Sequence, residues 1–203
     1  MNPAMPEANS WVLASHNTGK INEIRGLLAP QGINLQSAAD FSLPEPDETE
    51  STFTGNALLK ARAACRATNR PALADDSGLC VAALDGKPGI HSARWAGEPR
   101  DFMRAMQRIE DELAASGASD RSAAFICVLA LVFPDGNERF YEGRVEGQLV
   151  WPPRGEGGFG YDPVFQPHGD ERVFSEMTAT EKAGHSHRAK ALAKLMAAEF
   201  GSD

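Results

Sequence analysis

The chain has 203 residues, of which 42% are apolar and 24% charged, and it carries a formal net charge of -8 at pH 7. These values indicate a globular protein with a sizeable core, and the negative charge argues against a protein that coats nucleic acid, because binding to a phosphate backbone needs a positive surface. The 3 cysteines are far apart, which argues against a disulfide framework or a structural zinc site and favours a reducing compartment.

The sequence also bears on location and domain organisation. Its first residues contain no apolar stretch of the kind found in signal peptides, and no run approaches the roughly 20 apolar residues that span a membrane. We therefore expect a cytoplasmic protein that does not associate with membranes. No internal repeat divides the chain, so we expect one domain at residues 10–200, with residues 1–9 forming a flexible N-terminus.

The first expected elements are a strand at residues 11–14 and a helix at residues 21–28. Between them lies a polar loop with the sequence Ser15-His16-Asn17-Thr18-Gly19-Lys20. A strand, a glycine-containing loop and a helix in this order direct backbone amides and a helix N-terminus at one point, which suits an anion such as phosphate. Lys20 adds a full positive charge there.

This loop is not a P-loop, because Ala14 stands where that motif has its first glycine and Ile21 stands where it has Ser or Thr. The alternative interpretation is an ordinary connection in which Asn17 or Thr18 caps the helix.

An acidic, proline-containing loop is expected at residues 40–50, after a short strand at 33–35. Its carboxylates are a candidate source of ligands for a hard divalent cation, and the alternative is a loop that is merely solvated. A helix is expected from about Thr52. Asn56 and Lys60 lie one turn apart beside its apolar stripe, and from their spacing we expect surface residues.

The most informative stretch is Ala72-Leu73-Ala74-Asp75-Asp76-Ser77-Gly78-Leu79. An apolar run enters two carboxylates, and the Ser-Gly pair is expected to turn the chain sharply at the edge of a sheet. Neighbouring strand residues point to opposite faces, so only one of Asp75 and Asp76 can face a given site. A divalent cation would relieve the repulsion between two such carboxylates. The alternative is an acidic turn that caps local amides.

The second half of the chain predicts a helix at residues 99–115 and a β-hairpin formed by residues 123–133 and 138–150, with an Asp-Gly turn between its strands. The glycine-rich loop at 155–163 matches a dinucleotide fingerprint in letters only, because Pro163 prevents a helix from beginning there. Its aromatic residues either stack on a base or anchor the loop.

The last expected helix begins after Ser186, a natural N-cap. His187 and Arg188 then fall in its first turn, where positive charge opposes the helix dipole. Such a local cost suggests a ligand that benefits from these cations, and paired surface charges are the alternative.

Six motifs in order resemble those of the inosine/xanthosine triphosphate pyrophosphatases, and the resemblance extends from about Trp11 to Phe200. The motifs are residues 15–20, 52–61, 72–79, 87–94, 157–165 and 186–188. The resemblance implies an elongated α/β fold of two lobes, with a long mixed sheet flanked by helices, an active cleft between the lobes, and a homodimer.

The resemblance also implies an activity, the Mg²⁺-dependent hydrolysis of dITP, ITP, XTP and dXTP to the monophosphate and pyrophosphate, which clears deaminated purines from nucleotide pools. Its partner is then a small-molecule nucleotide rather than nucleic acid. Carried over by motif, Asp76 is the general base and a metal ligand, and Ser77 contacts the substrate. The residues implied to hold the phosphates are Ser15, His16, Asn17, Thr18, Gly19, Lys20 and Lys60, and those implied to surround the base and sugar are Phe159, Gly160, Tyr161, Asp162, Lys182, His187 and Arg188.

The acidic loop departs from the family pattern, because Glu48-Thr49-Glu50 stands where the family often has Glu-Thr-Gly. The second metal ligand is therefore open among Glu45, Asp47 and Glu48, of which we expect Glu48. An Asp with an ordinary pKa near about 3.9 is a weak base at pH 7, so a metal is expected to supply much of the rate. A pyrophosphatase with another base preference and a nucleotide-sensing module without turnover are the rival hypotheses.

Overall fold

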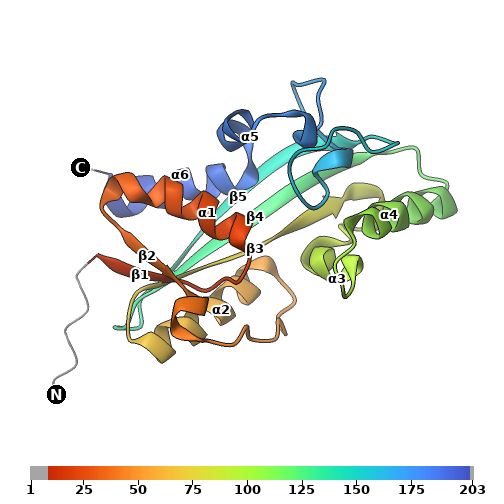
Figure 1. The fold of residues 1–203 in the computed structure, drawn as a ribbon. Coiled ribbons are helices and arrows are strands. Elements are labelled where there is room, and N and C mark those ends of the chain that lie inside the picture. The colour runs from red at the N-terminus through yellow and green to blue at the C-terminus, as the bar shows by residue number, and fades with distance from the viewer. Residues whose placement is uncertain (1–8, 202–203) are drawn as a thin grey trace, which may run out of the picture. The chain divides into compact units, whose positions relative to one another are not determined.

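The computed structural model describes residues 9–201 and shows an α/β fold with a mixed six-stranded sheet flanked by helices (Figure 1). The strand order is β2-β1-β3-β4-β5-β6. Strand β1 pairs in parallel with β2 and β3, whereas β5 and β6 are antiparallel. The strands are β1 (Ser10–Leu13), β2 (Asn34–Ser37), β3 (Ala72–Val81), β4 (Ser122–Val132), β5 (Glu138–Leu149) and β6 (Phe165–Pro167). The predicted fold class is confirmed.

Four of the helices begin at a residue whose side chain caps them, and among these Asn17 is an expected cap. Side chains of Asn17, Thr52, Asp101 and Thr178 accept hydrogen bonds from backbone amides in the first turns of the helices that follow them. None of the helices within residues 9–201 is long and apolar enough to cross a membrane. The α-helices are α1 (Thr18–Leu28), α2 (Phe53–Thr68), α3 (Ser92–Ala96), α4 (Phe102–Ser116), α5 (Ala179–His185) and α6 (His187–Phe200).

The chain divides into two compact units. The first contains the described residues up to Asp76, Val128–Tyr141 and those from Leu192 onward, and the second contains Ser77–Cys127 and Glu142–Ala191. The boundaries fall inside β3, β4, β5 and α6. Of the expected flexible N-terminus at residues 1–9, all but Asn9 lies outside the described residues.

The core of the first unit is built from small residues. Ala57, Ala61 and Ala64 of α2 pack against apolar residues of β1, β3 and β4, including Ala72 and Ala74. Within this unit α1 and α2 lie on opposite sides of the strands (Figure 1). Because side chains alternate along a strand, residues 72, 74 and 76 of β3 face α2, and residues 73 and 75 face the other side.

The core of the second unit is aromatic. The ring of Phe125 in β4 lies 4.7 Å from that of Phe165 and 5.9 Å from that of Phe174. Helix α4 contributes Met106, Ile109 and Leu113, which lie on one face of the helix because they are three or four positions apart. The predicted hairpin of β4 and β5 is also confirmed, including the alternation of buried and exposed residues along the second half of β5.

The expected turn at Ser77-Gly78 was wrong, because β3 runs through it without interruption to Val81. Gly78 meets a different requirement. A Cβ on Gly78 would overlap the carbonyl oxygen of Gly89 and the hydroxyl of Ser92. That hydroxyl accepts from the backbone N–H of Leu79 at 2.9 Å and donates to the Gly89 carbonyl at 2.7 Å. The glycine permits this close approach of a neighbouring segment, and the two aspartates lie within an interior strand rather than at its end.

Candidate active site

Five charged side chains of the first unit form what we call the carboxylate–lysine cluster: Lys20, Glu48, Lys60, Asp75 and Asp76. The ammonium of Lys20 lies 2.7 Å from Oδ1 of Asp75. The ammonium of Lys60 lies 2.8 Å from Oε1 of Glu48 and 3.5 Å from Oδ1 of Asp76. The two adjacent aspartates thus bond to lysines of different helices, α1 and α2, as the alternation of β3 predicts.

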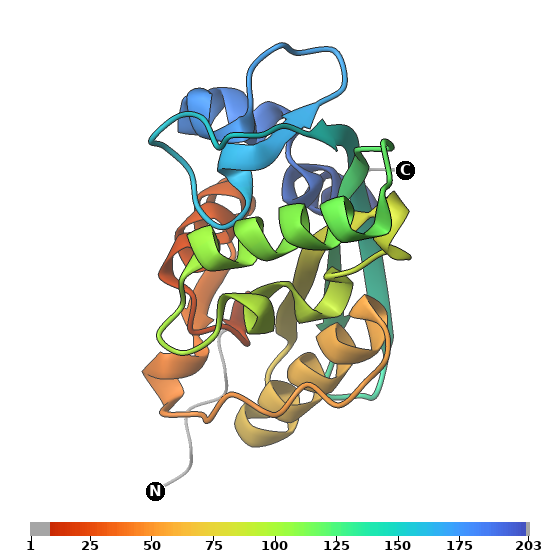
Figure 2. The same cartoon turned by 90° about the vertical axis from the view of Figure 1, so that its right-hand side faces the viewer.

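The cluster is largely buried, which corrects one prediction. Asn56 is 0% exposed and Lys60 is 5% exposed, although their position beside the apolar stripe of α2 suggested surface residues. The acidic loop runs along α2 in both views and covers the helix face beside its apolar stripe (Figure 1 and Figure 2). A side chain outside the stripe is therefore enclosed between helix and loop.

Burial changes the protonation behaviour of the cluster. It raises the pKa of Asp76 to about 6; the nearby Lys60 ammonium opposes this rise, and the Glu48 carboxylate adds to it. Burial acts to lower the pKa of Lys60, but attraction to the three carboxylates of the cluster outweighs it, so this pKa lies above its ordinary value. Lys60 therefore stays charged at neutral pH. Asp76 is a stronger base than the ordinary aspartate assumed from the sequence.

The loop between β1 and α1 is organised by its own side chains. Oδ1 of Asn17 accepts from the backbone N–H of Lys20 at 3.1 Å, and Oγ of Ser15 accepts from the N–H of Asn17 at 3.2 Å. The capping interpretation is thus confirmed for Asn17, while Thr18 and Gly19 are the first helical residues. Phosphate binding by this loop stays a prediction, which the Lys20 ammonium at the start of α1 supports.

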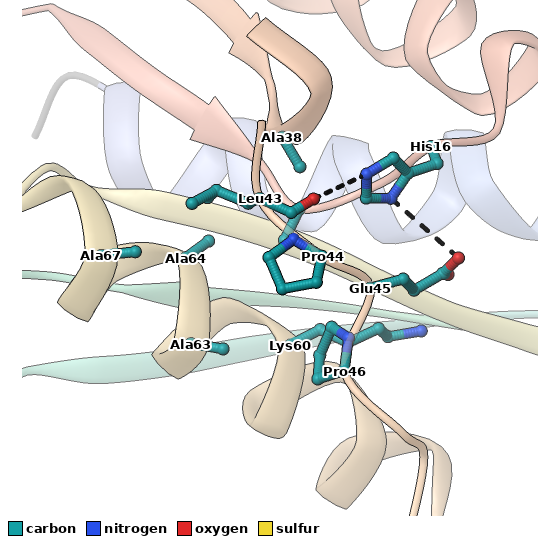
Figure 3. A pocket seen from close by; sticks show the side chains of 11 residues that line it. His16, Ala38, Leu43, Pro44, Glu45, Pro46, Lys60, Ala63, Ala64 and Ala67 are labelled. Carbon is teal, nitrogen blue, oxygen red and sulfur yellow. Dashed lines mark hydrogen bonds and ion pairs between the residues drawn. The ribbon is translucent and has the colours of Figure 1, made fainter. Parts of the chain in front are cut away.

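His16 is directed at the acidic loop rather than at the aspartates. Its Nε2 lies 2.9 Å from the carbonyl oxygen of Leu43, and its Nδ1 lies 4.0 Å from Oε2 of Glu45 (Figure 3). Beside it is a cavity of about 190 Å³ between the acidic loop and α2. The cavity is lined by Ala14, His16, Ala38, Leu43, Pro44, Glu45, Pro46, Lys60, Ala63, Ala64 and Ala67. These mostly apolar walls do not suit a phosphate.

In the second unit, Lys182 is held between an acid and an aromatic ring. Its ammonium forms an ion pair with Asp162 and lies 4.3 Å from the ring centroid of Phe159. Asp162 is buried and also accepts from the Phe159 N–H at 2.7 Å. Burial raises the pKa of Asp162, and Lys182 acts against that rise. The Asp162 carboxylate thus holds both the backbone of Phe159 and the Lys182 ammonium that lies over the Phe159 ring.

The start of α6 brings two further predicted site residues into the second unit's interior. His187 stacks on Phe125 with ring centroids 4.8 Å apart and an interplanar angle of 9°. Nη2 of Arg188 donates to Oγ of Ser77 at 3.3 Å. Both side chains are buried, so they are not the paired surface charges of the alternative interpretation. Ser186 is the predicted cap and accepts from the Ala189 N–H at 3.0 Å.

The two aromatic residues of the glycine-rich loop have different roles. Tyr161 is buried, its hydroxyl donates to the Ser92 carbonyl at 2.8 Å, and its ring meets that of Phe102 edge-on. It anchors the loop. Phe159 is 46% exposed and available for stacking. Between them, Gly160 has φ +68°, a conformation that favours glycine.

The fit to a metal ion rests on a small donor set. Within residues 9–201 there is no group of three or more His, Cys, Asp and Glu side chains arranged to hold a metal. Mg²⁺ commonly takes one or two carboxylates and completes its shell with water and substrate phosphates. Glu48 and Asp76 already converge on one cation, the Lys60 ammonium, so this pair fits such a site. Of the alternatives, Glu45 faces His16 and Asp47 is exposed.

The sequence pattern did not indicate that Asp75 and Asn56 contact other residues of the site. Asp75 entered only as the neighbour of Asp76, whereas it is the partner of Lys20. Asn56 was assigned to the surface, whereas its Oδ1 accepts from the backbone N–H of Glu50 in the acidic loop at 3.0 Å. The available signal was position: Asn56 lies one helical turn before Lys60.

Comparisons with known proteins agree with this fold. A model described as the Ham1 family matches residues 11–198. Proteins named dITP/XTP pyrophosphatase are 53% identical in Mesorhizobium japonicum (93% of this chain, 92% of that protein) and 55% identical in Rhodospirillum centenum (95% of each). The structure of a HAM1 protein from Coxiella burnetii is 40% identical with a TM-score of 0.90, covering 95% of this chain and 99% of that one. The dITP/XTP pyrophosphatase structure from Mycobacterium abscessus is 40% identical with a TM-score of 0.76, and the match covers 92% of this chain and 98% of that one. The chain therefore belongs to the Ham1 family.

Proposed function

We propose that this protein hydrolyses dITP, ITP, XTP and dXTP to the nucleoside monophosphate and pyrophosphate, depends on Mg²⁺, and removes deaminated purine nucleotides from the nucleotide pool. The observation that carries the proposal is the buried Asp76, which shares the Lys60 ammonium with Glu48. The names of the relatives support the substrate class.

The carboxylate–lysine cluster suits the phosphate end of such a substrate. Lys20 and Lys60 bring two positive charges to a triphosphate, and each now bonds to a carboxylate that the phosphates would replace. A Mg²⁺ ion held by Glu48 and Asp76 would neutralise further charge on the phosphates and polarise the attacking water. Such neutralisation is needed because the nucleophile approaches a polyanion.

Asp76 suits the role of general base in attack on the α-phosphorus. In the metal-free protein burial raises the pKa of Asp76 to about 6, so its carboxylate is more basic than that of an ordinary aspartate, and a cation bound to Asp76 would lower this pKa. Asp76 takes the proton from the water, and Lys60, charged throughout, holds the carboxylate in place. The central position of β3, between β1 and β4, fixes the backbone that carries this base.

The residues of the second unit suit the base and sugar. The exposed Phe159 ring can stack on a purine, since base–aromatic stacking contributes about 1–3 kcal/mol. Donors on His187 and Arg188 pair with a 6-oxo group, and against a 6-amino group they would meet another donor. A buried mismatch of this kind discriminates strongly, which accounts for a preference for deaminated purines.

We further propose that the protein acts in the cytoplasm as a homodimer, for which the family resemblance is the support. Light scattering on the purified protein measures its mass directly, and a monomer at micromolar concentration would contradict the proposed dimer.

The experiment that tests the activity is pyrophosphate release from ITP and from ATP with Mg²⁺, in the wild type and in Asp76→Asn. We expect rapid release from ITP, weak release from ATP, and loss of both in the variant. A folded protein that binds ITP in the presence of Mg²⁺ without releasing pyrophosphate would instead establish the nucleotide-sensing module.

A further inference from the structure

Asn56 is a buried polar residue whose presence stability does not explain. It is 0% exposed, and its Oδ1 accepts from the backbone N–H of Glu50 at 3.0 Å. Its Nδ2 is buried and has no hydrogen-bond partner within residues 9–201. A buried donor without an acceptor costs about 1–3 kcal/mol, and a leucine of similar shape would avoid that cost. The residue therefore has a use other than stabilising the fold.

The hydrogen bond restrains the acidic loop close to Glu48. Glu50 follows Glu48 by two positions, and two residues span at most about 7 Å, so fixing the Glu50 amide limits how far Glu48 can move from α2. Lys60, one turn beyond Asn56 on the same face, holds the Glu48 carboxylate at 2.8 Å. Helix α2 thus holds the loop at its backbone and at its side chain.

Gly55, the residue before Asn56, also allows the contact between α2 and Glu50. A Cβ on Gly55 would lie 2.7 Å from Cβ of Glu50, so the glycine allows Glu50 to lie against the first turn of α2. Thr52 caps that turn by accepting from the Gly55 N–H at 3.0 Å. Two consecutive helical residues are therefore adapted to one residue of the acidic loop.

We infer that Asn56 is a positioning residue, which holds Glu48 beside Lys60 and Asp76 so that the two carboxylates are ready to share a divalent cation. The consequence for catalysis rests on the proposed function. The restraint itself does not, because it concerns only residues of the first unit. Loss of a group that orients a metal ligand typically weakens metal affinity about 10–100-fold.

The test compares the wild type with Asn56→Leu, which lacks the acceptor, and Asn56→Asp, which retains it. Hydrogen exchange measured by NMR reports the Glu50 amide, and Mn²⁺ titration followed by electron paramagnetic resonance reports metal affinity without nucleotide. We expect Asn56→Leu to exchange the Glu50 amide at least tenfold faster, to bind Mn²⁺ about 10–100-fold more weakly, and to melt no lower than the wild type. Asn56→Asp should exchange the Glu50 amide about as slowly as the wild type, because it retains the acceptor.

A second variant covers the case in which Asn56→Leu does not fold. Gly55→Ala favours the helix by its propensity but displaces Glu50, so we expect the same faster exchange and weaker Mn²⁺ binding. Unchanged Glu50 exchange, or Mn²⁺ affinity within twofold of the wild type, would overturn the inference. A wild type that binds no Mn²⁺ would also overturn it.

These outcomes are separable from those of the proposed function. If the wild type does not hydrolyse ITP but exchange and Mn²⁺ affinity change as expected, the function fails and the role of Asn56 stands. If ITP is hydrolysed and neither measurement changes, the function stands and the role of Asn56 fails.

Discussion

Replacing Lys60 by methionine tests whether the burial and charge of the carboxylate–lysine cluster set the protonation of Asp76. Methionine keeps an unbranched apolar stem within the buried site and removes the ammonium. In the wild type, burial raises the pKa of Asp76 to about 6 although Lys60 lowers it. Without Lys60 only the raising influences of burial, Glu48 and Asp75 remain, together with the weaker opposing effect of Lys20.

The size of the effect follows from the distance. Unit charges 3.5 Å apart, as Lys60 Nζ and Asp76 Oδ1 are, attract by about 5 kcal/mol at an effective dielectric constant of about 20. Since about 1.4 kcal/mol corresponds to one pKa unit, even a quarter of this attraction would raise the pKa of Asp76 from about 6 to about 7. We therefore expect at least half of the Asp76 carboxyls to be protonated at pH 7 in Lys60→Met.

The assay is an NMR titration of the Asp76 carboxyl carbon in metal-free protein, from pH 3 to pH 9. Lys20→Met is the matched control, because Lys20 bonds to Asp75 and affects Asp76 less, so the shift should be smaller. A wild-type pKa near the ordinary value of about 4, or the same pKa in Lys60→Met, would refute the reasoning.

Three further predictions concern Asp76, Arg188 and Gly143. The pKa of Asp76 is higher in the folded protein than in the unfolded chain, so its ionisation disfavours folding and stability is lost as pH rises towards 6. Asp76→Asn should therefore melt at a higher temperature than the wild type at pH 8. An equal or lower melting temperature would contradict this. Arg188→Ala should narrow the ratio of kcat/KM for ITP to that for ATP, whereas an unchanged ratio would exclude Arg188 from base selection. A Cβ on Gly143 would overlap the backbone of His187 and Ala191, so Gly143→Ala should lower the free energy of unfolding, measured by urea denaturation, by about 1–3 kcal/mol. The control is Gly26→Ala in α1, whose added Cβ meets nothing within 4 Å and should not lower the stability of the protein. Equal losses of stability in the two variants would contradict this explanation.

Features with a local signal were predictable from the sequence. The caps at Asn17, Thr52 and Ser186 and the Asp-Gly turn between β4 and β5 depend on residues a few positions apart, and each is present in the structure. The opposite orientations of Asp75 and Asp76 follow from strand geometry alone.

Features that depend on distant segments were not predictable. Glycine serves both for turns and for close packing, and only the approach of Gly89 and Ser92 shows which use applies at Gly78. Asn56 and Lys60 are buried because a charged loop, which composition assigns to solvent, lies over α2. The raised pKa of Asp76 depends on that burial, so it could not follow from the residue type.

In the proposed reaction, the ion pairs of the carboxylate–lysine cluster would make nucleotide binding an exchange of anions, in which phosphates replace carboxylates at the two lysines. The cluster has three carboxylates and two ammonium groups, a formal balance of -1 when all are ionised, because 2 - 3 = -1. A bare triphosphate would be repelled by that balance as much as drawn to the lysines, whereas a triphosphate that brings a divalent cation supplies the missing positive charge. If the proposed function holds, the cluster would therefore favour the metal complex of a nucleotide over the free anion.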